Sequence, residues 1–205
     1  SVYRHVFTEA QEDGAPLTML VTTHSPHIAS VAPLRSVVLL KDEGDAGTKG
    51  YAAEAINLED DEVDDIARYL DVTRAEILFA RGVLLVEGDA ERFLVPALAE
   101  GLGHVLDELG ITVCSVAGTN FRPYAKFLVG LGIPFAVITD WDPIQGKKPL
   151  GRNRSLRLVR DIETQRTGTE PTALIEEIDA IADYDDFAER CETYGIYTNR
   201  KTLEV

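Results

Sequence analysis

The amino-acid sequence predicts an α/β fold in which a central parallel sheet is flanked by helices. Three continuous apolar runs carry this prediction: residues 82–87 (GVLLVE), 111–117 (ITVCSVA) and 134–140 (PFAVITD). Runs of this kind are typical of strands that are buried on both faces. Segments with helical periodicity separate the three runs, and a β-α-β-α-β order implies parallel strands with helices on the faces of the sheet.

The part of the chain before residue 81 predicts a smaller mixed segment. Ser25 followed by Pro26 is typical of a helix start, because serine caps a helix and proline fits its first position. Residues 61–70 place apolar side chains at helical spacing, and we expect this helix to continue to Phe79. The expected elements are strands at 17–23, 35–41 and 51–58, a turn at 42–50, and helices at 25–32 and 61–79.

The second part of the chain adds helices between and after the predicted strands. Asp89 lies near the start of the first of these helices, and Gly132 closes the second. After Pro143 the sequence becomes polar and helical, which we interpret as a helical insertion at about 152–194 followed by a short strand. The expected helices are 89–103, 120–132, 155–166, 171–182 and 184–195, and the expected last strand is 195–198.

Composition predicts a globular chain without membrane spans. Of the 205 residues, 45% are hydrophobic and 27% are charged, and no apolar run reaches the ~18 residues that a membrane helix needs. The two cysteines, Cys114 and Cys191, form no C-x-x-C pair, so we expect reduced thiols in a cytoplasmic protein. The start lacks both a methionine and the apolar core of a signal peptide, so we expect a fragment of a longer chain.

Charge is distributed unevenly along the sequence. A net charge of −15 argues against a nucleic-acid ligand when taken alone, because phosphates need a cationic surface. However, six of the acids lie together in residues 58–65 (LEDDEVDD), whereas residues 146–160 contain lysines and arginines and no acid. Two interpretations of this basic segment stay open: its arginines contact a DNA backbone, or they form the solvated face of a helix. The arginines concerned are Arg152, Arg154, Arg157 and Arg160.

Acidic side chains lie at the ends of two predicted strands. Glu87 ends the first apolar run and Asp140 ends the third, so parallel pairing brings both to one edge of the sheet. Glu91 lies on the first turn of the next helix, after a tight turn through Gly88, and Asp142 lies two residues beyond Asp140. Four neighbouring carboxylates repel one another unless cations bind, and hard divalent ions prefer oxygen ligands. The sequence therefore predicts a site for two divalent ions, of the kind that assists phosphodiester displacement.

The acidic motifs also resemble those of a known fold family. E-G-D-A-E at 87–91 and D-W-D at 140–142, with one strand and one helix between them, resemble the Toprim signature. Topoisomerases, primases, recombination mediator proteins and OLD-family nucleases share that fold. The resemblance implies a Toprim fold with a helical insertion, and DNA as a partner.

A second motif narrows the resemblance. Residues 17–30 (LTMLVTTHSPHIAS) look like the end of an ABC-type ATPase domain, with His24 as its switch histidine. An ATPase end joined to a Toprim domain is the layout of the OLD (overcoming lysogenization defect) nucleases. The resemblance implies that residues 1–80 are the C-terminal remnant of an ATPase domain and residues 81–205 are the Toprim catalytic domain. It also implies that the full-length parent is a homodimer through its ATPase part.

ATP hydrolysis is not expected from this chain itself. The sequence contains no G-x-x-x-x-G-K-[ST] phosphate loop, and its nearest approach, at 44–50, has the wrong spacing. ATP is therefore expected only as a ligand of the full-length parent.

The hypothesis that follows is a DNA endonuclease that depends on two Mg²⁺ or Mn²⁺ ions. The tail N-R-K-T-L-E at 199–204 looks like the late segment of the family, where a lysine and a glutamate complete the site. We expect the lysine to offset negative charge on the phosphate in the transition state. The expected metal ligands are Glu87, Glu91, Asp140, Asp142 and Glu204, and the expected catalytic residues are Glu87, Asp140, Asp142 and Lys201.

Three alternative functions stay open. A primase-like or topoisomerase-like Toprim protein would use the same acids for another reaction. A non-catalytic Toprim module would bind nucleic acid without cleaving it. An acidic α/β domain that binds protein partners through residues 58–65 would not respond to divalent ions; in that case Glu87 and Asp140 cap helices, and Glu91 and Asp142 are solvated.

Overall fold

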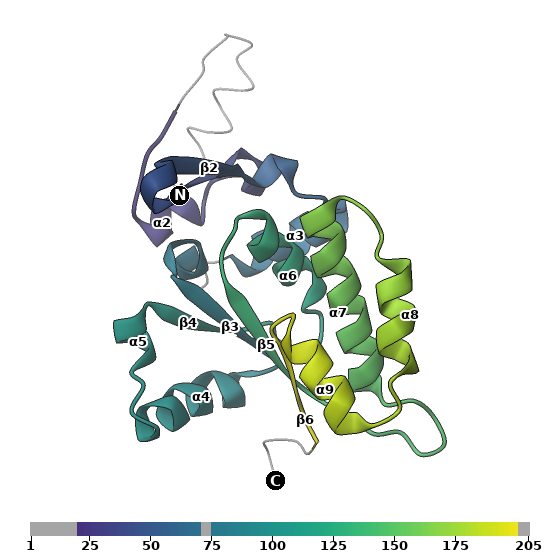
Figure 1. Cartoon of the computed structure of the whole chain (residues 1–205). Helices are drawn as coiled ribbons and strands as arrows, with labels where there is room; N and C mark the ends of the chain where they lie inside the picture. The colour runs from purple at the N-terminus through teal and green to yellow at the C-terminus, as the bar shows by residue number, and fades with distance from the viewer. Residues whose placement is uncertain (1–19, 71–74, 201–205) are drawn as a thin grey trace. The chain divides into compact units, whose positions relative to one another are not determined.

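The structure, a computed structural model, describes residues 20–70 and 75–200. The chain divides into two compact units, the first ending at Phe79 and the second beginning at Ala80. Figure 1 labels the helices and strands of both units, which are described separately below.

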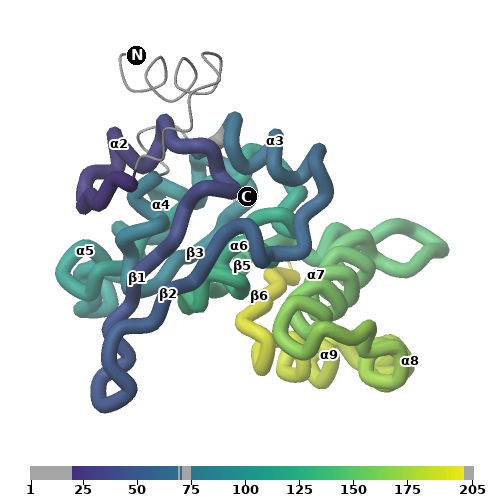
Figure 2. The backbone as a smooth tube through the Cα atoms, turned by 90° about the horizontal axis from the view of Figure 1, so that it is seen from above, coloured from purple at the N-terminus to yellow at the C-terminus, as the bar shows by residue number. Residues whose placement is uncertain are grey.

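The first unit combines a two-stranded antiparallel sheet with short helices. Its elements are α2 (Pro26–Ala29), η1 (Leu34–Ser36), β1 (Val38–Asp42), η2 (Gly44–Ala46), β2 (Thr48–Ala52), η3 (Ala53–Ala55), α3 (Asp60–Tyr69) and η4 (Ala75–Phe79). β1 and β2 pair from Val38↔Ala52 to Asp42↔Thr48, and Figure 2 shows the two strands running side by side. The strand expected at 35–41 is therefore confirmed as β1, with its start shifted toward Val38.

The turn between β1 and β2 forms because its residues suit the backbone conformation. Gly44 and Gly47 have φ angles of 63° and 77°, which glycine adopts without a Cβ clash. The side chain of Asp42 accepts a hydrogen bond from the Gly44 backbone N–H at 2.9 Å, a contact typical of turns. The turn expected at 42–50 is thus confirmed, although β2 already begins inside it at Thr48.

The acidic run at 58–65 forms the start of α3. Glu59 and Glu62 make a capping box, in which each side chain accepts a hydrogen bond from the other residue's backbone N–H. Acids in the first turn also interact favourably with the positive end of the helix dipole. Ile66, further along the same helix, is completely buried. Helix capping therefore accounts for much of this acidic run.

Two strands expected in the first unit differ from the structure. The strand expected at 17–23 is not formed over its described residues, 20–23, and its other residues lie outside the described part of the chain. The strand expected at 51–58 ends at Ala52. Beyond that point the Ile56 backbone N–H bonds to the carbonyl three residues earlier, which makes a 3₁₀ turn in place of a strand.

The expected helices of the first unit are confirmed in part. The helix predicted from Ser25 and Pro26 forms as α2, and the helical pattern at 61–70 forms as α3. The continuation to Phe79 is wrong in type where it is described, because η4 is a 3₁₀ helix. Residues 71–74 of that continuation lie outside the described residues.

The second unit is built around a four-stranded parallel sheet in the order β4-β3-β5-β6. Its strands are β3 (Gly82–Val86), β4 (Ile111–Ser115), β5 (Phe135–Asp140) and β6 (Ile196–Asn199). Val83 and Leu85 in β3 and Val137 in β5 are buried, as the apolar runs predict. The predicted α/β fold with a parallel sheet is confirmed, and the expected last strand joins the sheet beside β5.

The helices of the second unit lie between and beside these strands. They are α4 (Asp89–Gly101), α5 (Leu106–Leu109), α6 (Arg122–Gly130), α7 (Leu150–Thr167), α8 (Thr172–Ala180) and α9 (Tyr184–Glu192). α4 packs against β3 and β4, α6 against α7, and α9 against β6. The helical insertion is formed by α7, α8 and α9, which follow β5 and lead into β6 (Figure 1). The short helix α5 has no counterpart among the expected elements.

The start of α7 is fixed against the loop that follows β5. The Leu150 N–H donates to the Asp142 carbonyl at 3.1 Å, and the Gly151 N–H donates to the Trp141 carbonyl at 3.0 Å. A Cβ atom on Gly151 would lie only 2.7 Å from the Trp141 Cα and 2.8 Å from its carbonyl oxygen, so glycine permits this close approach. These bonds explain why α7 begins at Leu150 and not at 155, where the helix was expected.

Trp141 anchors the same loop to α9. Its ring meets the ring of Tyr184 edge to face at a centroid distance of 4.7 Å, and the ring of Phe187 at 5.5 Å. Phe187 is completely buried, and the Tyr184 hydroxyl donates to the Thr198 carbonyl in β6 at 2.5 Å. The insertion therefore holds the loop after β5 from two sides, through α7 and through α9.

Candidate functional site

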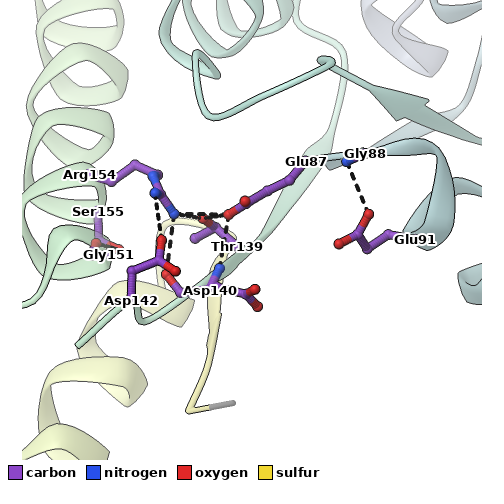
Figure 3. A network of polar contacts seen from close by, with 9 residues as sticks. All are labelled: Glu87, Gly88, Glu91, Thr139, Asp140, Asp142, Gly151, Arg154 and Ser155. Atoms are coloured by element: carbon purple, nitrogen blue, oxygen red, sulfur yellow. Dashed lines mark hydrogen bonds and ion pairs between the residues drawn. The ribbon is translucent and has the colours of Figure 1, made fainter. Parts of the chain in front are cut away.

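The carboxyl ends of β3 and β5 lie side by side and carry the acids that the sequence indicates. Glu87 directly follows β3, and Asp140 is the last residue of β5. Oε1 of Glu87 accepts hydrogen bonds from the Thr139 hydroxyl at 2.5 Å and from the Asp140 backbone N–H at 3.0 Å (Figure 3). The Glu87 side chain therefore connects the two strand ends, as parallel pairing predicts.

The surroundings of Asp140 disfavour ionisation of its carboxyl. Burial raises the pKa of its carboxyl above the ordinary value, and the charge of Glu87 raises this pKa further. A hydrogen bond with the Asn199 side chain opposes the rise, whereas the carboxylates of Asp142 and Glu91 add to it. The ionised form of Asp140 is thus disfavoured, and a cation bound nearby would favour it.

Asp142 is held in an unusual backbone conformation beyond the strand end. Its φ angle of 47° lies in the left-handed region, which aspartate tolerates better than most residues. The bond from Leu150 to its carbonyl keeps the peptide in place, while its carboxylate Oδ2 accepts a hydrogen bond from Arg154 at 2.8 Å. The spacing of Asp140 and Asp142 therefore does bring both acids to the same edge of the sheet.

Arg154 lies among these acids. Its Nη1 donates to Glu87 Oε1 at 2.9 Å, to the Asp140 carbonyl at 3.2 Å and to the Thr139 hydroxyl, and its Nη2 donates to Asp142 (Figure 3). The side chain is only 12% exposed. The sequence suggested a DNA contact or a solvated helix face for this arginine, whereas its guanidinium is bound within the acidic site.

Glu91 has a local role at the start of α4. Its Oε2 accepts a hydrogen bond from the Gly88 backbone N–H at 3.0 Å, and the residue is 9% exposed. Gly88 has an extended backbone, with φ of −138°, so the turn itself does not require glycine. A Cβ atom there would lie 3.2 Å from Glu91 Oε2, so glycine makes room for the carboxylate. Glu91 therefore caps α4 while lying near enough to Asp140 to affect its pKa.

Arg152 is bound away from the acids that follow β3 and β5, and its Nε pairs with Asp179 Oδ1 at 3.3 Å. Its Nη2 donates to the carbonyl of Asp179 at 2.8 Å and to that of Ile181 at 2.7 Å. The guanidinium also lies 4.3 Å from the centroid of the Phe187 ring, and the residue is 6% exposed. Because these contacts occupy the guanidinium, Arg152 joins the end of α8 to α9 and is not presented to a ligand.

The other site residues expected from the sequence are placed as follows. Arg157 is exposed on α7, and Arg160 on the same helix forms an ion pair with Glu170 at 3.5 Å. His24 is exposed just before α2 in the first unit. Lys201 and Glu204 lie outside the described residues.

In the described part of the chain, the acidic side chains are not arranged around one common metal position. Within residues 20–70 and 75–200, no group of three His, Cys, Asp or Glu side chains is arranged to hold a metal ion. The chemistry of the set nevertheless fits a hard divalent cation, because it consists of carboxylates gathered at one edge of a sheet. The burial of Asp140 and its repulsion by three other acids support the same fit.

Three residues at this edge were missed by sequence reasoning: Thr139, Arg154 in its acidic surroundings, and Asn199. Thr139 could have been found as the polar residue that interrupts an apolar strand one position before Asp140. Asn199 ends β6, so the strand-end argument that selects Glu87 would also have selected it once that strand was placed in the sheet. No sequence signal distinguishes Arg154 from the neighbouring arginines.

Comparison with known proteins identifies a matching family and relatives of this chain. Residues 78–142 match the family described as overcoming lysogenization defect protein-like, TOPRIM domain, and this range includes both acidic motifs. The uncharacterized protein YbjD of Escherichia coli (strain K12) is 33% identical over 152 residues, which are 74% of this chain and 27% of YbjD. The chain therefore spans about a quarter of that relative.

Solved structures similar to this chain include the C-terminal regions of two OLD proteins. The C-terminal region of the Burkholderia pseudomallei OLD protein is 46% identical, with a TM-score of 0.48, and the match covers 62% of this chain and 56% of that one. The C-terminal region of the Xanthomonas campestris pv. campestris OLD protein is 48% identical, with a TM-score of 0.49, covering 62% of this chain and 54% of that one. This chain thus spans just over half of either solved region.

Over the described ranges, every helix is too short or too polar to cross a bilayer.

Proposed function

This chain carries an OLD-like Toprim domain, a nucleic-acid-processing module, and from that premise we propose that it is a metal-dependent DNA endonuclease. The reaction proposed is hydrolysis of a phosphodiester bond, which nicks or cleaves DNA. The observation that carries the proposal is the meeting of Glu87, Asp140 and Asp142 at the carboxyl ends of β3 and β5, inside the range that matches the family.

Carboxylates gathered in this way favour divalent cations. The pKa of Asp140 is raised by burial and by the charges of Glu87, Asp142 and Glu91, so a cation that neutralises these groups would be bound favourably. We propose that these four acids hold Mg²⁺ or Mn²⁺, with Glu204 as a further ligand. Two ions bound so would supply an activated water and would stabilise charge on the attacking and leaving oxygens.

The chain's own residues would orient the phosphate and balance its charge. Glu87 and Asp140 project from adjacent strands of a rigid sheet, which limits their movement during the reaction. Lys201 is proposed to offset negative charge on the phosphate as the bond to the leaving 3′ oxygen breaks. Arg157 and Arg160 on α7 are proposed to contact the DNA backbone, since guanidinium groups match phosphate geometry.

A plasmid assay with a matched pair of variants tests the proposal. Supercoiled DNA is incubated with protein and Mg²⁺, Mn²⁺, Ca²⁺ or EDTA, and we expect nicked and linear products only with Mg²⁺ or Mn²⁺. Asp140→Asn keeps the shape of the side chain and removes its charge, and we expect it to lower the cleavage rate by at least about a hundredfold. The control is Asp107→Asn, because Asp107 is an exposed acid on α5.

The thermal stability of the Asp140→Asn protein shows whether a loss of cleavage comes from a damaged site or from an unfolded protein. Because Asp140→Asn removes a carboxylate that its neighbours repel, we expect its thermal midpoint in EDTA to equal or exceed that of the unsubstituted protein. Full cleavage by a pure, folded Asp140→Asn protein would refute the assignment of this site.

A non-catalytic Toprim module that binds nucleic acid is the second candidate. It is favoured by the absence, among the described residues, of three acids posed around one metal position, and by the pairing of two of the acids with Arg154. Divalent-dependent DNA binding with intact DNA in every lane of the plasmid assay would support this module. Relaxation of the plasmid without lasting nicks, or polymerisation of nucleotides, would instead support a topoisomerase-like or primase-like reaction.

The organisation of the longer parent is part of the same proposal. We infer that residues 1–80 derive from an ATPase domain that contained His24 as its switch residue, and that residues 81–205 are the Toprim domain. ATP turnover and homodimerisation would then belong to the parent, of which the YbjD match suggests that this chain is a small part. Light scattering on a full-length parent tests the dimer, and a monomer at micromolar concentration would contradict it.

A further inference from the structure

Arg154 is the most extensively bonded cation at the acidic edge. Its guanidinium reaches four acceptors on three successive parts of the fold: Glu87 after β3, Thr139 and Asp140 at the end of β5, and Asp142 in the following loop. Two of these acceptors are carboxylates, so the bonds are charge-assisted and strong for their type.

Arg154 is largely buried where it makes these contacts. Its side chain is 12% exposed, whereas Arg157, one turn further along the same helix, is exposed. A guanidinium that left this position would give up all four acceptors and would have to find replacements in water. A loosely held cation, such as one that a ligand displaces on arrival, would be expected to make fewer bonds.

The backbone of the helix that carries Arg154 is also held in place. α7 begins with N–H groups bonded to the carbonyls of Trp141 and Asp142, and Gly151 allows the helix to touch that loop. The Ser155 hydroxyl donates to the Gly151 carbonyl at 2.9 Å and is completely buried. The helix that carries Arg154 is therefore docked on the same loop that carries Asp142.

Arg154 binds only part of each carboxylate. Its bond to Glu87 ends on Oε1, the oxygen that also accepts from Thr139 and Asp140, and its bond to Asp142 ends on Oδ2. The second oxygens, Oε2 and Oδ1, are not the ones that these bonds use. Figure 3 shows Arg154 and Asp142 to the left of the Glu87 carboxylate, the Asp140 carboxylate below it and Glu91 to its right.

We propose that Arg154 is a positioning residue that fixes the Glu87 and Asp142 carboxylates so that their remaining oxygens bind a divalent cation together with Asp140. This inference rests on the proposed metal-dependent function and deepens it. Arg154 does not bind the cation itself. It orients the carboxylates that bind it, as residues that hydrogen-bond to metal ligands do in other sites. It is neither a DNA contact nor a substitute for the cation.

The test is the affinity for Mn²⁺, measured by calorimetry without DNA, in the whole chain and three variants. Arg154→Met keeps much of the side-chain length and removes the charge, and we expect the Kd for Mn²⁺ to rise about 10–100-fold. Arg154→Lys keeps the charge but cannot bridge two carboxylates as a planar fork does, so we expect it to recover only part of the affinity. Arg166→Met is the matched control on the same helix, because this exposed arginine pairs with Glu163 and has no part in the proposed site. We expect its Kd to equal that of the unsubstituted protein.

Thermal midpoints in EDTA accompany each affinity, so that a folding defect is recognised. If Arg154→Met does not fold, Arg154→Lys decides the question, because it is also expected to bind Mn²⁺ more weakly. An unchanged Kd in a folded Arg154 variant would show an ion pair that serves stability alone and would overturn the inference. A lower Kd would show that Arg154 competes with the cation and would overturn it equally.

Failure of the proposed function gives a different pattern. If the unsubstituted protein shows no saturable Mn²⁺ binding, the metal site is refuted and the role of Arg154 with it. If the unsubstituted protein binds Mn²⁺, Arg154→Met binds it more weakly and DNA stays intact with all metals, the role of Arg154 is supported while the nuclease proposal fails.

Discussion

Arg152 and Arg154 stand two residues apart on α7 and do unrelated things. A helix turns by about 200° over two residues, so neighbours of this spacing face opposite sides. Arg152 is thereby directed to the carbonyls at the end of α8, and Arg154 to the carboxylates after β3 and β5. The sequence shows how many basic side chains a segment contains. Which of them can contact a ligand depends on the side of the helix from which each one projects.

The buried thiol of Cys191 leads to a prediction at the same scale. Burial raises the pKa of Cys191 to about 12, although the nearby charges of Arg152 and Arg190 lower it. The folded state therefore keeps the proton while an unfolded thiol loses it above about pH 8.5. The free energy of unfolding should fall as pH rises from about 8.5 toward 12, by up to about 1.4 kcal/mol per pH unit.

Urea unfolding at pH 7.5, 9 and 10 measures this effect. Cys191→Ala is the comparison, because it removes the titrating group, and its stability should depend less on pH over the same range. Iodoacetamide should leave Cys191 unmodified in the folded protein at pH 8 and alkylate it in urea. Rapid alkylation of the folded protein at this position would contradict the burial.

Among the elements, the start of α7 needs glycine at position 151 for its close approach to the loop after β5. Gly151→Ala places a Cβ atom at 2.7 Å from the Trp141 Cα, which forces the helix away from the loop. We expect the free energy of unfolding to fall by about 1–3 kcal/mol, although alanine is the better helix former. Because Arg154 moves with the helix, Mn²⁺ affinity should fall as well.

Gly101→Ala provides the control for this prediction. Gly101 is the last residue of α4, and no atom lies within 4 Å of a Cβ built there. We expect its stability to stay within about 1 kcal/mol of the unsubstituted protein, as helix propensity alone would suggest. If Gly151→Ala and Gly101→Ala lower the free energy of unfolding equally, the close approach at Gly151 does not contribute to stability.

The elements that the sequence predicts best are those whose formation depends mainly on one property of the sequence. β3, β4 and β5 are confirmed because burial on both faces needs a continuous apolar run, which is visible in one dimension. The start of α7 was placed too late because it depends on bonds to Trp141 and Asp142, which the sequence pattern does not display. The strand expected at 51–58 was shortened by a 3₁₀ turn, which its apolar composition does not reveal.

The candidate site was predictable in its outline for the same reason. Parallel strands bring their carboxyl ends to one edge, so Glu87 and Asp140 could be paired from sequence alone. The partners of those acids come from β6 and from the insertion, so their contribution depends on the three-dimensional position of segments far along the chain. Asn199 and Arg154 are the clearest cases.

For the whole molecule, charge sets a condition on DNA binding. The chain carries a net charge of −15, so without divalent ions its overall field repels a polyanion. We expect fluorescence anisotropy to detect binding of a DNA oligonucleotide in Ca²⁺, and to show at least a tenfold weaker affinity in EDTA. The ionic strength is matched with KCl, since screening alone would otherwise weaken the contacts. Equal binding in EDTA would place the DNA contacts on the basic helix face alone.

Trp141, between Asp140 and Asp142, is the one tryptophan in the sequence. Its indole ring contacts Tyr184 and Phe187, while its own peptide groups join the two candidate ligands. A cation bound by those carboxylates would change the electric field at the indole, whether or not the backbone moves. The protein therefore contains an intrinsic fluorophore at its candidate site, and titrating Mg²⁺ while recording tryptophan emission would follow ion binding without a label, a dye or DNA.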